Sequence, residues 1–432
     1  MINFKKSIRY RFAKKLIFIG FFLKNHLISA FGFDLLIVPH GAGKKKILCF
    51  AKDEFHHDIK ILSLSNNIFS FLTLEVGHFK RLQNYFLKFT PNVNSYFSKD
   101  IEFEVGRYQK FLEKIILFLN KKYDFKIIVT CNFVYSALRP LPKILKKNKM
   151  KYFIIYKEGL ILTLNNKQIY DYSLFFKKYI YGFNLIDCDK ILVTNEYIAK
   201  TLKTISNNKF TNDNLKVCGL PRFDNLNDKS LHNKNYITIF EIDPIHTCYK
   251  FDQRNFNKEP NFIKLQTNLT KKYYDIIFDF IKENPDLNFI FKSKKSNKAS
   301  KLKNYFIDQL NNQNIKNITY SAKNSIEIIK MSKLIISLPS TVVIEAIYLD
   351  TKVLTPNFSK FFNHPEWTFF SENQNLNFIF NNKKDIYLAL NKDIDFSKKN
   401  KFLEKFTNFD PNKSFSLKIL NELLYDSDEN FS

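Results

Sequence analysis

The chain of 432 residues has few cysteines, few glycines and few acids for its number of bases. None of the five cysteines stands at the CxxC spacing of a zinc site, and several end short apolar runs. This scarcity argues against a disulfide framework and predicts a protein of the reducing cytosol. The nine glycines stand beside many lysines and phenylalanines. Such a composition is typical of AT-rich coding sequences, so single Lys or Phe residues carry little weight as signals.

The shortage of acids gives a formal net charge of +27 at pH 7. Such a charge suits nucleic acid, an anionic membrane surface or phosphorylated small molecules. The bases are spread along the chain, and no zinc-finger, RNP-type or helix-turn-helix signature is present. We therefore do not expect a nucleic-acid partner, which leaves the membrane and the phosphorylated ligand.

Residues 1–34 form a basic segment in which seven Lys or Arg residues precede the first acid, Asp34. Its apolar core, Leu16 to Leu23, is shorter than the ~20 residues that a membrane-spanning helix needs. No convincing small-residue cleavage site follows, as a secretory signal would require. The pattern favours a basic amphipathic helix on the cytoplasmic face of a membrane. A first helix that packs on its own domain is the alternative.

After this segment, short apolar strands alternate with helical stretches, as in parallel sheets covered by helices on both faces. The predicted strands are Lys46–Ala51, Phe125–Cys131, Lys151–Tyr156, Lys190–Thr194, Leu215–Cys218, Tyr236–Glu241, Asn288–Lys292, Asn317–Tyr320, Lys333–Ser337 and Lys352–Thr355. The predicted helices include Ile101–Asn120, Glu196–Ile205, Thr270–Glu283, Ser300–Asn311, Ser325–Met331, Thr341–Leu349 and Ser414–Tyr425.

A polar, irregular stretch at Gly219 to Asn235 marks the best domain boundary. A chain of this length also predicts two domains of roughly 200 residues each. We expect an α/β protein with two Rossmann-like, doubly wound domains that face a cleft, at residues 35–222 and 223–412. A C-terminal helix and acidic tail, 413–432, could cross back to the first domain.

The sequence ISLPSTVVIEA changes from strand-like to helical at a Pro-Ser-Thr turn. Ser337 ends the predicted strand, and Ser340 and Thr341 stand where the helix begins. The free N–H groups and the dipole of a helix N-terminus attract anions, and hydroxyls add donors for phosphate oxygens. Glu345 follows one turn later, where its carboxylate can accept hydrogen bonds from a ribose diol. The alternative is ordinary N-capping by Ser340 with a solvated Glu345.

Three further loops follow predicted strands, and ligands of open parallel sheets bind at such strand ends. Lys292 and Lys294 come at and after the end of FIFK, where cations can neutralise a diphosphate. Glu158 ends IIYKE and is placed as a general base. Arg222, in GLPRF, can clamp a phosphate. The alternatives are, in the same order, a solvated charge run, an exposed turn and a rigid hinge.

The sequence FHHD holds His56 and His57 but has no second pair of metal ligands nearby. We therefore interpret these histidines as surface residues, and we expect no metal site.

Four of these stretches occur in a recognisable order. They are YKEG at Tyr156–Gly159, GLPRFD at Gly219–Asp224, FKSK at Phe291–Lys294 and SLPSTVVIEA at Ser337–Ala346. In this order they resemble the GT-B glycosyltransferases of bacterial lipopolysaccharide and capsule biosynthesis. They are also distantly similar to Kdo- and sialyl-transferases and to CDP-glycerol glycerophosphotransferases. The resemblance covers roughly residues 150–360.

The resemblance implies a GT-B fold and metal-independent transfer of a sugar from a nucleotide-activated donor, with no cofactor. It also implies that Glu158 deprotonates the acceptor hydroxyl, that the Ser/Thr turn binds donor phosphate and that Glu345 binds ribose. Together with the strand-end analysis, it gives seven donor-side residues: Arg222, Lys292, Lys294, Ser337, Ser340, Thr341 and Glu345.

Two departures from the family leave the donor class open. Lys157 stands where many relatives have a second acid, and Ser293-Lys294 where many have His-Pro. We expect an enzyme that adds a sugar to a growing glycan or glycolipid acceptor at the inner face of the cytoplasmic membrane. The alternatives are a CDP-alcohol phosphotransferase, a sugar-nucleotide epimerase and a degenerate glycosyltransferase that serves as a scaffold.

Overall fold

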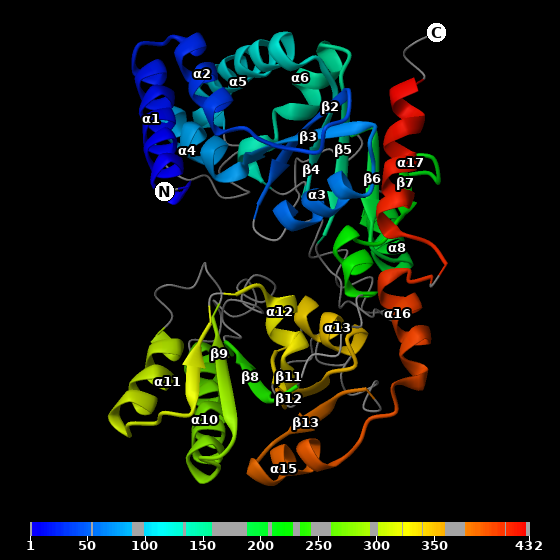
Figure 1. Ribbon diagram of the computed structural model, residues 1–432. Coiled ribbons are helices and arrows are strands. Elements are labelled where there is room, and N and C mark those ends of the chain that lie inside the picture. Colours follow the sequence, from blue (N-terminus) through cyan, green and yellow to red (C-terminus); the bar gives the residue numbers. More distant parts are fainter. Residues whose placement is uncertain are drawn as a thin grey trace. The chain divides into compact units, whose positions relative to one another are not determined.

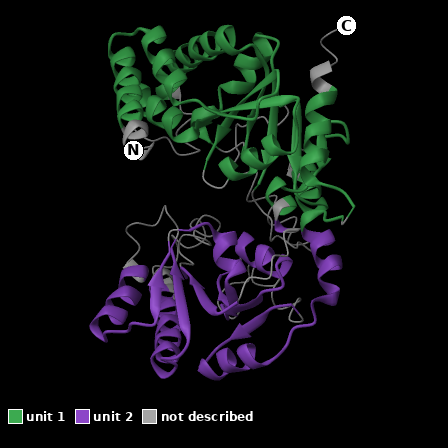
Figure 2. Cartoon of the chain, in the orientation of Figure 1, with its two compact units in different colours: residues 1–159, 169–225, 407–432 green, residues 160–168, 226–406 purple. Residues whose placement is uncertain are grey.

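The computed structural model describes residues 2–52, 55–88, 99–132, 135–157, 188–205, 210–227, 234–242, 261–293, 301–321, 323–338, 340–358, 376–410 and 412–428 (Figure 1). The chain divides into two compact units, which Figure 2 colours separately. The first comprises Met1–Gly159, Ile169–Asn225 and Thr407–Ser432, and the second comprises Leu160–Gln168 and Leu226–Phe406. The structure determines each unit by itself.

The first unit is built on a sheet whose described strands follow the order β1-β3-β2-β4-β5-β6-β7. These strands are β1 (Val38–His40), β2 (Lys45–Ala51), β3 (Phe69–Glu75), β4 (Phe125–Thr130), β5 (Lys151–Tyr156), β6 (Lys190–Val193) and β7 (Leu215–Val217). The edge strand β1 runs antiparallel to β3, and the other strands are parallel to their neighbours. The central strands are apolar runs because helices cover the sheet.

The helices of the first unit include a pair at the N-terminus and one at the C-terminus. They are α1 (Ile2–Phe22), α2 (His26–Leu36), α3 (Phe55–Leu64), α4 (Val76–Leu87), α5 (Glu102–Tyr123), α6 (Leu141–Lys147), α8 (Glu196–Ile205) and α17 (Phe415–Asp428), with 3-10 turns η2 (Lys99–Ile101), η3 (Ser136–Leu138) and η5 (Pro221–Asn227). The last helix, α17, contacts α3. The C-terminal segment of the chain therefore packs on the first unit, which is formed mainly by N-terminal residues.

The second unit is built on a parallel sheet with the order β10-β9-β8-β11-β12-β13 among the described residues. Its strands are β8 (Tyr236–Phe240), β9 (Asn288–Lys292), β10 (Ile318–Tyr320), β11 (Ser332–Ile336), β12 (Lys352–Pro356) and β13 (Phe378–Phe380). Its helices are α10 (Asn261–Glu283), α11 (Lys301–Asn312), α12 (Ser325–Lys330), α13 (Thr341–Tyr348), α15 (Lys383–Asn391) and α16 (Lys399–Thr407), with the 3-10 turn η6 (Phe396–Lys398). Numbered along the chain, this is the order 3-2-1-4-5-6 of a Rossmann domain.

The core of the second unit follows from the alternation of side chains along its strands. Ile237 and Ile239 of β8 point to a fully buried cluster that includes Tyr274, Ile277 and Phe280 of α10. Thr238, between them, shares a hydrogen bond of 2.7 Å between its Oγ1 and Ser332 Oγ of the neighbouring strand. The hydroxyl pair satisfies two buried polar atoms, so the opposite face of the sheet can also be covered by helices.

The two α/β units confirm the predicted fold class of two Rossmann-like domains. The chain passes from the first unit to the second between Asn225 and Leu226 and returns between Phe406 and Thr407. None of the four described cysteines forms a disulfide, and all four are buried. Among the helices that the structure describes, none is long and apolar enough to span a membrane.

Candidate functional site

The strand order of the second unit places a topological switch point between β8 and β11. From β8 the chain winds outward through β9 and β10, and it then returns to the other side of β8 to form β11. Loops leave the carboxyl ends of β8 and β11 in opposite directions at such a point, and ligands of open parallel sheets bind in the crevice that this creates. The Pro-Ser-Thr turn follows β11 and therefore lies at the position that the topology favours.

The turn offers hydroxyl and N–H groups at the start of α13. Ser340 is the N-cap residue with extended backbone (φ −161°, ψ 172°), but its side chain makes no cap hydrogen bond. Ser340 and Thr341 are both half-buried. The predicted alternative, capping of the helix by the Ser340 hydroxyl, is therefore wrong. The first turn of α13 keeps N–H groups and hydroxyls that suit an anion.

Ser337 lies at the same turn, but its hydroxyl has a local partner. Its Oγ donates to the backbone oxygen of Leu338 at 2.9 Å, and the side chain is buried. Its N–H donates to Leu354 O of β12 at 3.1 Å. The N–H bond holds the end of β11 in the sheet, and the hydroxyl bond fixes the turn, so the role of Ser337 as a phosphate donor stays a prediction.

Glu345 lies on α13 one turn after Thr341, as predicted, but its side chain is only 4% exposed. It is therefore not the solvated glutamate of the alternative interpretation. A buried carboxylate is stable only where polar groups of the protein surround it. Its role as a ribose ligand stays a prediction.

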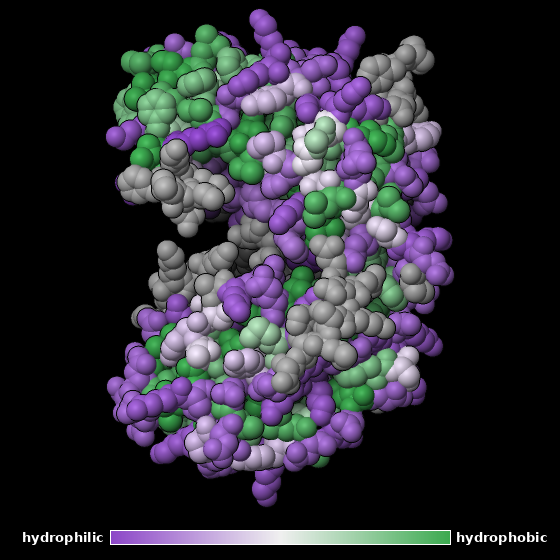
Figure 3. Space-filling model, viewed as in Figure 1, coloured by the Kyte–Doolittle hydropathy of each residue, from purple (hydrophilic) through white to green (hydrophobic). Residues whose placement is uncertain are grey.

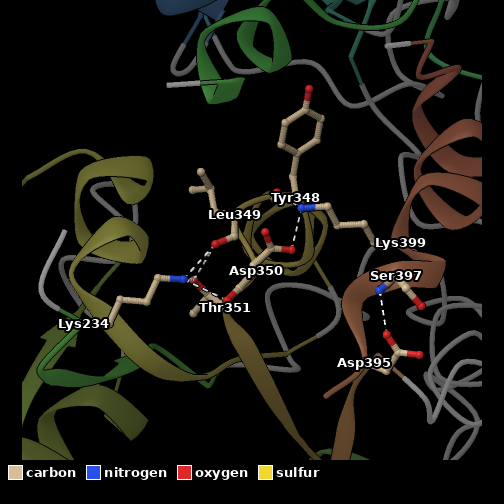
Figure 4. A network of polar contacts seen from close by, with 8 residues as sticks. All are labelled: Lys234, Tyr348, Leu349, Asp350, Thr351, Asp395, Ser397 and Lys399. Carbon is tan, nitrogen blue, oxygen red and sulfur yellow. Dashed lines mark hydrogen bonds and ion pairs between the residues drawn. The ribbon is translucent and has the colours of Figure 1, made fainter. Parts of the chain in front are cut away.

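Lysines cover the other end of α13, as Figure 4 shows. Lys234 Nζ donates to Leu349 O and Asp350 O, each at 2.8 Å, and to Thr351 Oγ1 at 3.1 Å. Lys399 Nζ donates to Tyr348 O at 3.2 Å and pairs with the Asp350 carboxylate. Burial lowers the pKa of Lys234, and the nearby carboxylate of Asp350 offsets this only in part. These cations complement the negative C-terminal end of the helix dipole and anchor that end of α13.

Lys292 ends β9, and its backbone pairs with Phe240 at the end of β8. It is half-buried, and its carbonyl accepts from Glu241 N at 2.9 Å. Lys292 and the Ser340–Thr341 turn therefore stand at the same edge of the sheet, on either side of β8. Lys294 and Glu158 lie outside the described residues.

Arg222 is buried in the first unit and does not present the expected phosphate clamp. Its Nε donates to Asp58 Oδ1 at 2.8 Å, its Nη2 pairs with Asp58 Oδ2, and its backbone N–H donates to Oδ1 at 3.3 Å. Asp58 is fully buried, and Arg222 is 5% exposed. The Nε and Nη2 edge of the guanidinium, which would bind a phosphate, already binds the Asp58 carboxylate. We correct the expectation for Arg222 to a structural ion pair.

The other residues of GLPRFD hold the C-terminal helix. Asp224 Oδ1 accepts from Phe415 N, and Oδ2 accepts from Ser416 N and Ser414 Oγ, each at 2.8 Å. Gly219 has a φ of +81°, and a Cβ there would lie 1.9 Å from Phe415 Cδ1. The motif thus connects the end of β7 to α3 through Arg222 and to α17 through Gly219 and Asp224. Sequence reasoning missed this because the partners lie about 190 residues away.

A second pair of polar side chains stands at the carboxyl edge of the first sheet. His56 Nε2 lies 2.6 Å from Glu75 Oε2, and both side chains are about two-fifths exposed. His56 is in the first turn of α3, which follows β2, and Glu75 ends β3. FHHD was interpreted as a surface motif, and His56 is indeed accessible, but it also has a carboxylate partner. In the part of the chain that the structure describes, no group of three or more His, Cys, Asp or Glu residues could hold a metal ion.

No family model and no curated protein matches the sequence. Solved structures do match the fold. A protein from Listeria monocytogenes, assigned as a UDP-N-acetylglucosamine 2-epimerase, aligns over 90% of this chain and 98% of its own, with 12% identity and a TM-score of 0.52. The fold is GT-B. A glycosyltransferase from Rickettsia africae aligns over 90% of this chain and 100% of its own, with 16% identity and a TM-score of 0.48. At these identities the similarity describes the GT-B fold alone, and GT-B proteins differ in their chemistry.

Proposed function

We propose that the chain is a glycosyltransferase that moves a sugar from a nucleotide-activated donor to a growing surface polysaccharide or lipopolysaccharide. The observation that carries this proposal is the Ser340–Thr341 turn at the switch point of a Rossmann-ordered sheet. Transfer needs no metal ion in this proposal, because the helix N-terminus and nearby lysines take over the neutralisation of the leaving diphosphate. The enzyme works at the inner face of the cytoplasmic membrane, where its acceptor is held.

The donor phosphates bind the start of α13. The Ser340 and Thr341 hydroxyls and the first N–H groups of the helix donate to phosphate oxygens, while the dipole favours their negative charge. Lys292, at the neighbouring strand end, supplies a full positive charge, and Lys294 is expected to add another. The turn and Lys292 both follow strands of one sheet. The sheet therefore holds these hydrogen-bond donors in position before the nucleotide sugar binds.

A thermal-shift panel of CMP-, CDP-, UDP- and GDP-linked compounds tests the donor site. A ligand that binds only the native state raises the melting temperature. We expect one nucleotide class to do so, and Ser340→Ala with Thr341→Ala to remove most of the shift. Ser325→Ala is the matched control, because Ser325 is the first residue of α12, which follows the edge strand β10 and not the switch point. Equal losses in both proteins would remove the turn from the donor site.

Product analysis separates transfer from the other reactions that a GT-B enzyme could perform. A transferase consumes the donor only when an acceptor is present and releases the free nucleotide. An epimerase converts a UDP-sugar to its epimer without any acceptor, and a CDP-alcohol phosphotransferase releases CMP. A scaffold leaves all donors unchanged. Phosphorus and proton NMR of the mixtures distinguish these outcomes, and acceptor-independent epimerisation would contradict the proposal.

Two residues compete for the role of general base. Glu158 is the base that the family resemblance implies. His56 is the second candidate, because its bond to Glu75 is the carboxylate–imidazole arrangement that fixes a histidine tautomer. Removal of the true base should lower kcat by about 10²- to 10⁴-fold and leave the nucleotide-induced thermal shift unchanged. Glu158→Ala and His56→Gln are compared in the transfer assay with His57→Gln as control, and a normal rate in either variant removes that residue from the mechanism.

A further inference from the structure

The N-terminal helices α1 and α2 form a tightly packed hairpin. Gly20 and Gly32 allow the close approach, since a Cβ on Gly20 would lie 2.4 Å from Ser29 Oγ and one on Gly32 would lie 2.8 Å from Ala13 O. Ser29 Oγ also donates to Ile17 O at 3.0 Å. The hairpin is therefore a fixed element with a fixed outer surface.

A second side of α1 packs on the first unit through aromatic rings. Phe21 lies against Tyr85 and Phe86 of α4, with ring centroids 5.3 and 5.1 Å apart. The ring centroid of Tyr10 lies 5.7 Å from that of His78, which is also on α4. The sequence left open whether this segment packs on its own domain or lies on a membrane, and the packing is now shown. It uses only part of the surface of α1.

The remaining side of the hairpin exposes large apolar side chains. We call it the hairpin face and define it by Ile8, Phe12, Ile19, Phe22, Leu27 and Phe31. Phe22 is 64% exposed, and the neighbouring Leu23 is 65% exposed. The first four residues recur at helical spacing on α1, and the last two are one turn apart on α2. Figure 3 shows the resulting hydrophobic region at the upper left, over α1 and α2.

The charges of the hairpin face all have one sign. Lys15 stands within the stripe between Phe12 and Ile19, and Arg11 and Lys24 are exposed beside it. The first acid, Asp34, is buried and accepts from Lys122 Nζ and Tyr123 Oη, each at 2.6 Å. If a second copy of this chain bound here, the same cations would face one another. Another protein would need acidic residues opposite them. Anionic lipid headgroups supply negative charge above an apolar layer, which matches basic residues interleaved with apolar ones.

We propose that the hairpin face binds the surface of a bilayer that contains anionic lipids, with α1 lying in the interface and not across it. The apolar side chains enter the boundary between headgroups and acyl chains, and the stems of Arg11, Lys15 and Lys24 extend so that their charges reach the phosphates. This inference goes beyond the proposed sugar transfer, which it does not require. It names the surface, the helix orientation and the lipid class.

Vesicle sedimentation tests the hairpin face with the full chain. Vesicles of phosphatidylcholine with phosphatidylglycerol should sediment the protein, and pure phosphatidylcholine vesicles should sediment much less of it. Ile19→Glu with Phe22→Glu should reduce the bound fraction at least tenfold. The control, Leu388→Glu with Leu417→Glu, changes exposed apolar residues elsewhere and should bind like the parent.

The charge term is tested separately. Arg11→Glu with Lys15→Glu should weaken binding more than tenfold, since each basic residue near an anionic surface is worth about fivefold in affinity. Lys398→Glu with Lys401→Glu makes the same change in net charge at other exposed positions and should have a much smaller effect. Equal effects of the two pairs would mean that only the net charge of +27 matters, which would overturn the assignment of the face.

A depth measurement tests the orientation of α1. The single tryptophan, Trp367, is replaced by Phe, and a new tryptophan is placed by Phe22→Trp or, as control, by Leu417→Trp. Brominated lipids should quench the first and not the second. Lack of quenching at position 22 overturns the proposal. So does a homodimer, seen by light scattering without lipid, that Phe22→Glu dissociates. Both readouts are independent of sugar transfer, so a failed transfer assay leaves this test intact.

Discussion

At the scale of single residues, His78 couples the stability of the first unit to pH. It is 6% exposed and lies beneath α1. Burial, more than the nearby charges of Arg81 and Lys14, lowers its pKa from 6.5 to about 4, and Glu75 opposes this only in part. The folded protein therefore holds a neutral imidazole at a pH where the unfolded chain is already protonated.

The sign of the effect follows from this difference. Between pH 6.5 and about 4 the unfolded state binds more protons, so the free energy of unfolding falls as the pH is lowered through this range. We expect His78→Gln to remove about 2–3 kcal/mol of this acid-induced loss, measured by urea unfolding at pH 7.5 and 4.5. His57→Gln, on α3, serves as the control, and an unchanged pH dependence in His78→Gln would contradict the prediction.

Residues whose roles depend on distant partners could not be predicted from the sequence. The Ser340–Thr341 turn was placed correctly, because a strand, a breaker and a helix follow one another locally. Arg222 was assigned to a ligand, because nothing near it in the sequence reveals that Asp58, 164 positions away, occupies its guanidinium. Cations at strand ends have the same appearance in sequence whether they bind ligand or protein.

At the scale of elements, strands with long apolar runs were predicted almost to the residue. Lys151–Tyr156 and Asn288–Lys292 match β5 and β9, since a fully buried strand needs a continuous run of apolar residues. The edge strands β1 and β13 were missed, although the equally short β7 and β10 were predicted. The strand β3 and the helices α3, α4, α15 and α16 were not assigned either. The amphipathic patterns of these helices are short and contain many of the Lys, Asn and Phe residues that the composition spreads everywhere, whereas Ser70 and Thr73 interrupt the apolar residues of β3.

Gly219 determines whether the element α17 can dock. A side chain there would enter the space of the Phe415 ring and would need the unfavourable φ of +81°. We expect Gly219→Ala to lower the free energy of unfolding by about 2–4 kcal/mol, measured by urea denaturation.

Gly106 supplies the opposite control. It lies inside α5, and nothing stands within 4 Å of its would-be Cβ. Gly106→Ala should therefore stabilise the protein by about 0.5–1 kcal/mol, since alanine is the better helix former. Equal effects of the two substitutions would refute the docking role of Gly219.

At the scale of the whole molecule, the two structural units do not correspond to the N-terminal and C-terminal halves of the chain. The first unit takes in residues from Thr407 onward, and Lys190 Nζ of β6 donates to Glu422 Oε2 of α17 at 2.8 Å. Ile419 and Leu423 of α17 are fully buried. The C-terminal helix is thus part of the core of the first unit.

Removal of this helix should damage the first unit and spare the second. For a chain that stops after Asn408, we expect faster hydrogen exchange in β6, β7 and α3, because these elements lose buried contacts and the Asp224 and Glu422 bonds. Exchange in β8, β9 and β11 should stay close to that of the full chain. Mass spectrometry of peptides from both units measures this, and greater loss of protection in the second unit would contradict the assignment.

The return of α17 also sets an order of events during synthesis on the ribosome. Strands β2 to β7 emerge early, yet the apolar surface that receives Ile419 and Leu423 stays uncovered until the last part of the chain has been translated. The second unit, whose strands are contiguous in sequence, can finish its own sheet before that moment. The nascent first unit therefore keeps this apolar surface exposed while the whole second unit is translated, and this surface is where a chaperone would have the longest time to bind.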